Sequence, residues 1–230
     1  MRKKSVSFYL LLLLLVSFAF NSGCAKNKDA DQADNANREK YQQIAGYSIT
    51  TMIEVATKLT LFSFQSPQSF PMDLIPSYDG NTGWWSLNLQ LSNNQIIAAR
   101  IQLNDASGNF YKYYDPNIIT NIKATGEGSG TNVDFSYNLT LTQMGNGYNA
   151  ILINGSGAVN YQGTSGTFTV NNVAINKYQD GIPDGGQMVV VVQGCSFNMV
   201  FNGNNSIQVT YSYQGQSYTM TINLATGQIS

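Results

Sequence analysis

The chain has 230 residues, of which only 11% are charged, and its 12 basic residues nearly balance its 13 acidic ones. It contains no histidine, which excludes Ser-His-Asp and Cys-His catalysis and histidine-ligated zinc. A sparsely charged, slightly acidic chain is a poor match for phosphate backbones, so no nucleic-acid partner is expected. No residue pattern indicates a cofactor.

The first segment, residues 1–23, is typical of an export signal. Basic residues at positions 2–4 precede an apolar run over residues 6–20 and then a short, small and polar stretch. The apolar run is shorter than the about 20 residues that a membrane-spanning helix needs. The sequence therefore predicts a cleaved signal peptide, which takes no part in the fold.

The end of this segment resembles the lipobox of bacterial lipoproteins, because Ser22 and Gly23 stand directly before Cys24. The family usually has an aliphatic residue at the position of Asn21. The resemblance implies that Cys24 becomes the first mature residue and carries acyl chains that anchor the protein to a membrane. In this family an aspartate after the cysteine favours the inner membrane, so Ala25 favours the outer membrane. We expect a lipid-anchored protein of the bacterial cell envelope.

Residues 24–40 carry balanced charges and no aromatic or β-branched side chain. They cannot bury enough apolar surface to fold, which predicts a flexible tether behind the lipidated cysteine. Residues 41–230 suit one domain. If Cys24 is lipidated, Cys195 has no partner within the chain, so no disulfide is expected. Cys195 starts a predicted strand with no basic neighbour, which indicates a buried, unreactive thiol.

Apolar residues recur at helical spacing from Arg38 to about Phe64, and we expect the helix to end before Pro67. From Gly83 the period changes to two, as in the segment around Phe135, which is typical of strands with one buried face. Closely spaced turn signals predict a meander of about ten antiparallel strands. They include Asn93-Asn94, Asn154-Gly155, Gly163 to Gly166, Asn202-Gly203-Asn204 and Gln214-Gly215.

One helix followed by strands with a single apolar face predicts a mainly β domain. The sheet either curls around the helix as a half-barrel or folds over into a β-sandwich, and we favour the curled sheet. As an architecture, this resembles the half-barrel of periplasmic lipoprotein carriers and receptors of the LolA and LolB type. The chain has no second helical insertion between strands, which those carriers have.

Clustered aromatic residues are candidates for ligand binding. Trp84, Trp85, Tyr111 and Tyr113 lie in short segments where strand alternation places some side chains on the exposed face. Exposed, coplanar rings there would stack on a sugar or a peptide. The alternative is that these rings belong to the core and its rim.

The segment "DGIPD" resembles a fragment of the calcium-binding thrombospondin type 3 repeat. It offers only Asp180 and Asp184, whereas calcium takes 6 to 8 oxygen ligands. A Gly/Pro turn between two strands explains the segment more simply, with Pro183 fixing the backbone. The sequence therefore predicts a turn, with a surface calcium site as the alternative.

The leading functional hypothesis is a lipid-anchored, non-enzymatic envelope protein that binds an apolar ligand or a protein partner between helix and sheet. A surface adhesin or glycan-binding module is the first alternative. A carboxylate-dependent hydrolase is the second, and it requires two acidic residues held in one cleft.

Overall fold

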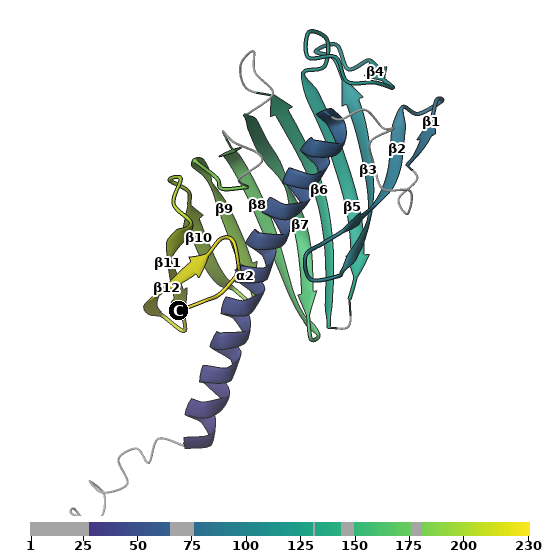
Figure 1. Ribbon diagram of the computed structural model, residues 1–230. Helices are drawn as coiled ribbons and strands as arrows, with labels where there is room; N and C mark the ends of the chain where they lie inside the picture. Colours follow the sequence, from purple (N-terminus) through teal and green to yellow (C-terminus); the bar gives the residue numbers. More distant parts are fainter. Residues whose placement is uncertain (1–27, 65–75, 131, 144–149, 176–180) are drawn as a thin grey trace, which may run out of the picture. The chain divides into compact units, whose positions relative to one another are not determined.

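The computed structural model describes residues 28–64, 76–130, 132–143, 150–175 and 181–230. The chain divides into two units, Met1–Lys40 and Tyr41–Ser230, and the second unit contains every strand. Within the described residues there are one helix and twelve strands, which Figure 1 labels α2 and β1 to β12.

Helix α2 spans Lys28–Phe64, and Pro67, before which we expected it to end, lies outside the described residues. It begins earlier than expected, because residues 28–40, predicted as part of a flexible tether, are helical. Alanine, glutamine, glutamate, lysine and arginine in this segment favour helix formation. The lack of apolar side chains excludes a buried face but does not exclude a helix.

From Tyr41 onward, α2 packs one face against the sheet. The side chains on this face have exposed fractions of 0–5%; they include Ile44, Ala45, Ile49, Met52, Val55, Ala56, Leu59 and Phe62. The face also contains hydroxyl groups. Ser48, Thr60 and Ser63 each donate a hydrogen bond to the main-chain carbonyl four residues earlier. The contact between helix and sheet is therefore filled with apolar side chains and satisfied hydroxyls.

The strands form one antiparallel sheet in the order β1-β2-β3-β5-β6-β7-β8-β9-β10-β11-β12, with β4 pairing only with β3. Neighbours in the chain are neighbours in the sheet, as the closely spaced turns predicted. The bounds are β1 Ser77–Asp79, β2 Trp84–Gln90, β3 Ile96–Asn104, β4 Phe110–Tyr111, β5 Asn121–Ser129, β6 Val133–Gln143, β7 Ile151–Tyr161, β8 Thr164–Ile175, β9 Gly185–Val192, β10 Cys195–Val200, β11 Ser206–Tyr213 and β12 Gln216–Asn223.

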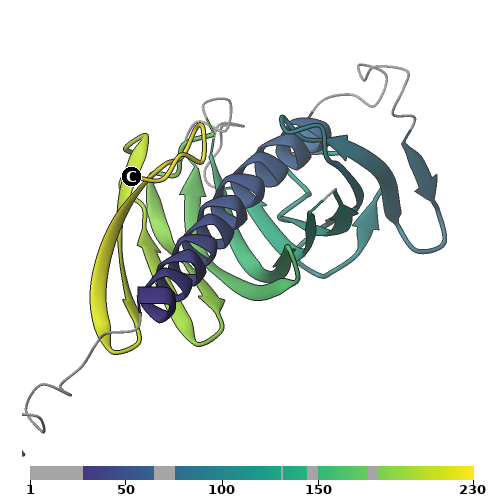
Figure 2. The same ribbon diagram turned by 90° about the horizontal axis from the view of Figure 1, so that it is seen from below.

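The sheet curls around α2 without closing on itself, as Figure 2 shows. Glycines on the inner face make room for aromatic rings in its centre. Gly126, Tyr137, Gly157 and Phe168 are successive partners across β5, β6, β7 and β8. A Cβ atom on Gly157 would lie 2.1 Å from the ring of Phe168 and 2.3 Å from the carbonyl oxygen of Ser136. Glycine is favoured at both positions, because a neighbouring ring, and at Gly157 also the main chain, occupies the space of a side chain.

One predicted turn is wrong. Asn154-Gly155 lies inside β7, where the pairing with β8 shifts register between Ile153 and Gly155. Gly155 has φ +143°, and a Cβ there would lie 2.2 Å from the carbonyl oxygen of Asn138. A β-bulge uses the same residue types as a turn, so the local sequence did not separate the two.

The predicted fold class is confirmed: a mainly β domain with a curled, open antiparallel sheet and an N-terminal helix. All strands belong to a single sheet, so the domain is not a two-sheet sandwich.

Candidate functional site

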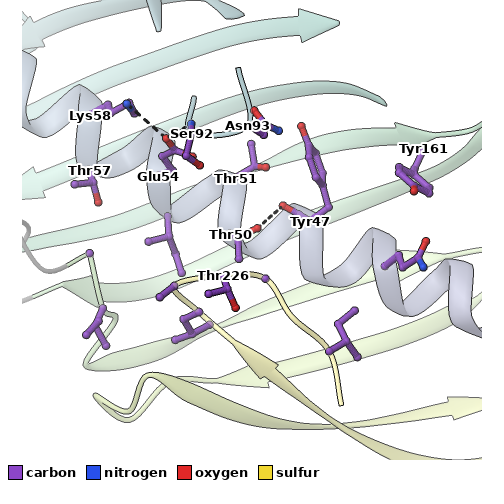
Figure 3. A pocket seen from close by; sticks show the side chains of 18 of the residues that line it. Tyr47, Thr50, Thr51, Glu54, Thr57, Lys58, Ser92, Asn93, Tyr161 and Thr226 are labelled. Carbon is purple, nitrogen blue, oxygen red and sulfur yellow. Dashed lines mark hydrogen bonds and ion pairs between the residues drawn. The ribbon is translucent and has the colours of Figure 1, made fainter. Parts of the chain in front are cut away.

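An open groove of about 760 Å³ lies along the outward face of α2 (Figure 3). Its floor is one stripe of the helix, spaced alternately by four and three residues; the stripe consists of Gln43, Tyr47, Thr50, Glu54, Thr57 and Leu61. This spacing keeps the side chains on one side of a helix. With a rise of about 1.5 Å per residue, the stripe is roughly 27 Å long. The groove is therefore elongated and suits a chain-like ligand.

The turn between β2 and β3 forms one wall of the groove. The Glu54 carboxylate accepts hydrogen bonds from the Ser92 N–H at 2.7 Å and the Ser92 hydroxyl at 2.9 Å. The Lys58 ammonium lies 3.5 Å from the same carboxylate. Glu54 thus holds the turn against the helix, and Lys58 balances its charge.

Tyr47 joins the groove floor to the inner face of the sheet. Its hydroxyl donates to the side-chain oxygen of Gln95, whose amide donates to the carbonyl of Gly128 at 3.3 Å. Its ring packs edge-on against Phe135 with centroids 6.1 Å apart. Burial is the main cause that raises the pKa of Tyr47, so its hydroxyl stays protonated as a donor.

The segment 224–230 forms the opposite wall. It turns back at Asn223, whose main chain pairs with Gln228, and Ser230 exchanges two hydrogen bonds with Thr221 at the edge of β12. The side chain of Ile229 reaches Gly46 of α2, where a Cβ would lie 3.0 Å from the Cδ1 atom of Ile229. Gly46 therefore permits this close approach.

One hydroxyl of the groove lacks a partner. The Oγ1 atom of Thr57 is buried and makes no hydrogen bond with any described residue. The carbonyl of Ile53 lies four residues earlier, yet Thr57 does not use it, unlike Ser48, Thr60 and Ser63 with their own carbonyls. A Cβ on Gly181 would lie 3.6 Å from this oxygen, so Gly181 covers it at one end of the groove.

The four candidate aromatic residues do not form one surface. Trp84 faces outward, half-buried, with the Arg100 guanidinium 5.1 Å from the centre of its ring. Trp85 is 6% exposed and packs against Phe62 of α2, with its indole N–H donating to the Lys112 carbonyl at 2.9 Å. The two indoles therefore lie on opposite faces of the sheet.

The two tyrosines of that set also have separate surroundings. Tyr111 is half-buried and its hydroxyl donates to Asp105 at 3.2 Å. Tyr113 is 62% exposed, with the Lys112 ammonium 5.3 Å from the centre of its ring. The bond to Asp105 is the main cause that raises the pKa of Tyr111. None of the four residues lines the groove on α2.

The predicted lipid anchor and half of the predicted calcium pair, Cys24 and Asp180, lie outside the described residues. Asp184 is exposed directly before β9, and its N–H donates to the carbonyl of Ala174. Among the described residues, no three acidic or cysteine side chains come together as a metal site would require.

Two other acidic residues serve turns. Asp79 accepts from Thr82 and Asn81, and Asp105 accepts from Asn109 and Ser107. These hydrogen bonds lower the pKa of both carboxyl groups, led by the side-chain bond from Thr82 and from Asn109 respectively. A general acid at neutral pH needs the opposite shift.

Cys195 is 3% exposed and its thiol donates to the Ser212 carbonyl at 3.1 Å. Burial raises the pKa of this thiol, which keeps it in the unreactive protonated form.

Sequence reasoning missed the groove. The helical spacing over Tyr41–Phe62 predicted one buried face, and the residues on the outward face of the same helix were not distinguished from it. The walls come from residues 92–93, 181–182 and 224–229, which are far apart in the sequence. The available signal was the row of polar residues Thr50, Glu54 and Thr57 at helical spacing.

Among the described residues, no helix combines the length and apolar character that crossing a membrane requires. No family model matches the chain, and no match was found among the curated proteins or the solved structures.

Proposed function

We propose that the protein is a lipid-anchored, non-enzymatic binding protein of the bacterial cell envelope, with the groove on α2 as its binding site. The groove is the observation that carries this proposal, because it is large, elongated and bordered by two segments held firmly in place. Membrane attachment is supported by the lipobox-like sequence before Cys24, and Ala25 supports the outer membrane.

Binding on the outward face of α2 is favoured over binding between helix and sheet. A ligand between the two would have to displace side chains such as Ile49, Met52 and Leu59, all of which are 0% exposed. Each costs about 2–5 kcal/mol when its packing is lost. The outward groove receives a ligand without that cost.

A role in binding, as opposed to catalysis, is supported by the chemistry of the groove. Among the described residues that line it, the ionisable groups other than tyrosines are Glu54 and Lys58, and these pair with each other. The chain has no histidine. Glu54 and Lys58 form a surface ion pair that holds a turn, and neither side chain is activated as a nucleophile or a general base.

Site-specific photo-cross-linking in intact cells tests the binding site. A photoreactive phenylalanine analogue at Thr226, on the groove rim, should form an adduct with a cell-envelope component. The same group at Thr219, exposed on the outer face of β12, is the matched control and should form none. Equal labelling at both positions, or none at Thr226, contradicts the proposal.

Membrane fractionation tests the anchor. Cys24→Ser should release the full chain from the membrane fraction, because two or more acyl chains are needed for stable attachment. Cys195→Ser, which changes the other cysteine, should leave the protein in the membrane fraction. If Cys24→Ser fractionates like the unchanged protein, Cys24 is not the anchor.

A further inference from the structure

The charges of the groove cancel within it, which limits the kind of ligand it suits. The carboxylate of Glu54 is bound by Ser92 and by Lys58, and among the described residues no other acidic or basic side chain lines the groove. An anionic ligand would find only a lysine that is already paired, and a cationic ligand only a carboxylate that is already bound. An uncharged ligand leaves this arrangement intact.

The polar groups of the groove are side-chain hydroxyls and amides. Gln43, Thr51, Asn93 and Thr226 line it together with Thr57. Its floor is an α-helix, whose main-chain groups are used within the helix. A peptide is commonly held through its main chain by a sheet edge, and this floor offers none. A ligand that carries its own hydroxyl groups in several directions fits better.

Apolar surface accompanies these polar groups. Ile182, Leu224 and Ile229 line the groove, and Tyr161 lies at the end where Tyr47 stands (Figure 3). Sugar rings combine hydroxyl edges with apolar C–H faces, and such faces pack on aromatic and aliphatic side chains. The mixture of lining groups matches this chemistry.

Thr57 supplies the most specific observation. A buried hydroxyl without a partner is destabilising. The buried hydroxyls of Ser48, Thr60 and Ser63 avoid that state, because each donates to a carbonyl in the preceding turn of the helix. The oxygen lies under Gly181, so a ligand hydroxyl reaches it from the groove only when Gly181 and Ile182 move outward. A ligand hydroxyl that enters there completes the missing hydrogen bond.

We propose that the groove on α2 binds an uncharged glycan chain, with the Thr57 hydroxyl as a contact that favours hydroxyl-bearing ligands. This inference rests on the proposed function, in which the groove is the binding site. It names the ligand class, which the fold and the anchor leave open.

Isothermal titration of the full chain tests the ligand class. The probes are two neutral oligosaccharides, chitotetraose and maltoheptaose, an anionic one, oligogalacturonate, and an uncharged Gly-Ser peptide of similar length. At least one neutral oligosaccharide should bind, and the anionic sugar and the peptide should not. If only the peptide binds, or neither neutral oligosaccharide binds at millimolar concentration, the glycan class is overturned. The photo-cross-link at Thr226 then decides separately whether the groove is a binding site at all.

Thr57→Val, which replaces the hydroxyl with a methyl group of similar shape, tests the contact. Binding of the oligosaccharide should weaken by about threefold to tenfold, which corresponds to one neutral hydrogen bond. The melting temperature without ligand should stay the same or rise, because an unsatisfied hydroxyl is removed. Thr219→Val, the matched control on the outer face of β12, should leave the affinity unchanged. Unchanged affinity in Thr57→Val overturns the role of this hydroxyl.

Discussion

The two faces of α2 differ in the hydrogen bonds that their polar side chains make. On the inward face, hydroxyls such as Ser48 and Thr60 are 0% exposed and bond to the helix itself. On the outward face, Thr50 also bonds to the helix, but Glu54 bonds to a distant turn and Thr57 has no described partner. The Thr57 hydroxyl is therefore the group on this face that a ligand could satisfy. We assign stability to the inward face and, in the proposed function, binding to the outward face.

The largest effect is expected on the inward face. Leu59→Ala should lower the free energy of unfolding by about 2–5 kcal/mol, because Leu59 is 0% exposed and its removal leaves a cavity between α2 and the sheet. Chemical denaturation of the full chain measures this loss. Leu61→Ala, which truncates a half-buried leucine on the groove side, is the control and should cost less. Equal losses would mean that the two faces do not differ in packing.

The second effect concerns the sheet under the inward face. Gly157→Ala should destabilise the domain by about 1–3 kcal/mol, because the added methyl group meets Phe168 and the Ser136 carbonyl. Gly185→Ala is a matched control, since nothing lies within 4 Å of a Cβ there. The difference in melting temperature between the two variants measures the effect. A Gly157→Ala variant as stable as Gly185→Ala contradicts the close approach of ring and strand.

A smaller effect is expected on the outward face. Glu54→Ala should cost about 1 kcal/mol, because it removes the acceptor of both Ser92 hydrogen bonds. Lys58→Ala removes only an ion pair whose lysine is 38% exposed, and it should cost less than about 1 kcal/mol. Hydrogen exchange at the Ser92 amide should rise in Glu54→Ala and stay unchanged in Lys58→Ala. If both variants behave alike, the carboxylate does not hold the turn.

The smallest effect is a dependence of stability on pH at a site remote from α2. Hydrogen bonds from Asn109 and Ser107 hold the pKa of Asp105 below its ordinary value of 3.8. The stabilisation is therefore complete above that ordinary value and is lost as the pH falls through the lowered pKa. Asp105→Asn should flatten the fall of melting temperature below about pH 4. An unchanged acid profile would remove Asp105 as a contributor.

The sequence predicted the buried side of the helix and sheet well, because burial produces a regular spacing of apolar residues within each segment. The helical stripe through Met52 and Leu59 and the alternation through Phe135 are both confirmed. The start of α2 was missed because helix propensity does not require a buried face. The bulge at Gly155 was read as a turn because glycine with positive φ, as found at Gly155, is common in both.

The groove on the outward side of α2 could not be predicted from local sequence patterns. The groove exists because Ser92 and the segment 224–230 flank the helix, and neither position in space follows from local periodicity. Trp84 and Trp85 were predicted as candidate binding residues because they are adjacent aromatic residues. Adjacent residues in a strand, however, place their side chains on opposite faces of the sheet. The unpartnered hydroxyl of Thr57 could be recognised only once its surroundings were known.

Isoleucine-methyl NMR of the full chain, titrated with chitotetraose and maltoheptaose, tests the central claim most directly. Ile182 and Ile229 line the groove, whereas Ile44 and Ile49 are 0% exposed between α2 and the sheet. We expect the methyl signals of Ile182 and Ile229 to shift on binding and those of Ile44 and Ile49 to stay unchanged. Shifts confined to Ile44 and Ile49 would place the ligand between helix and sheet and contradict the assignment of the outward groove as the binding site.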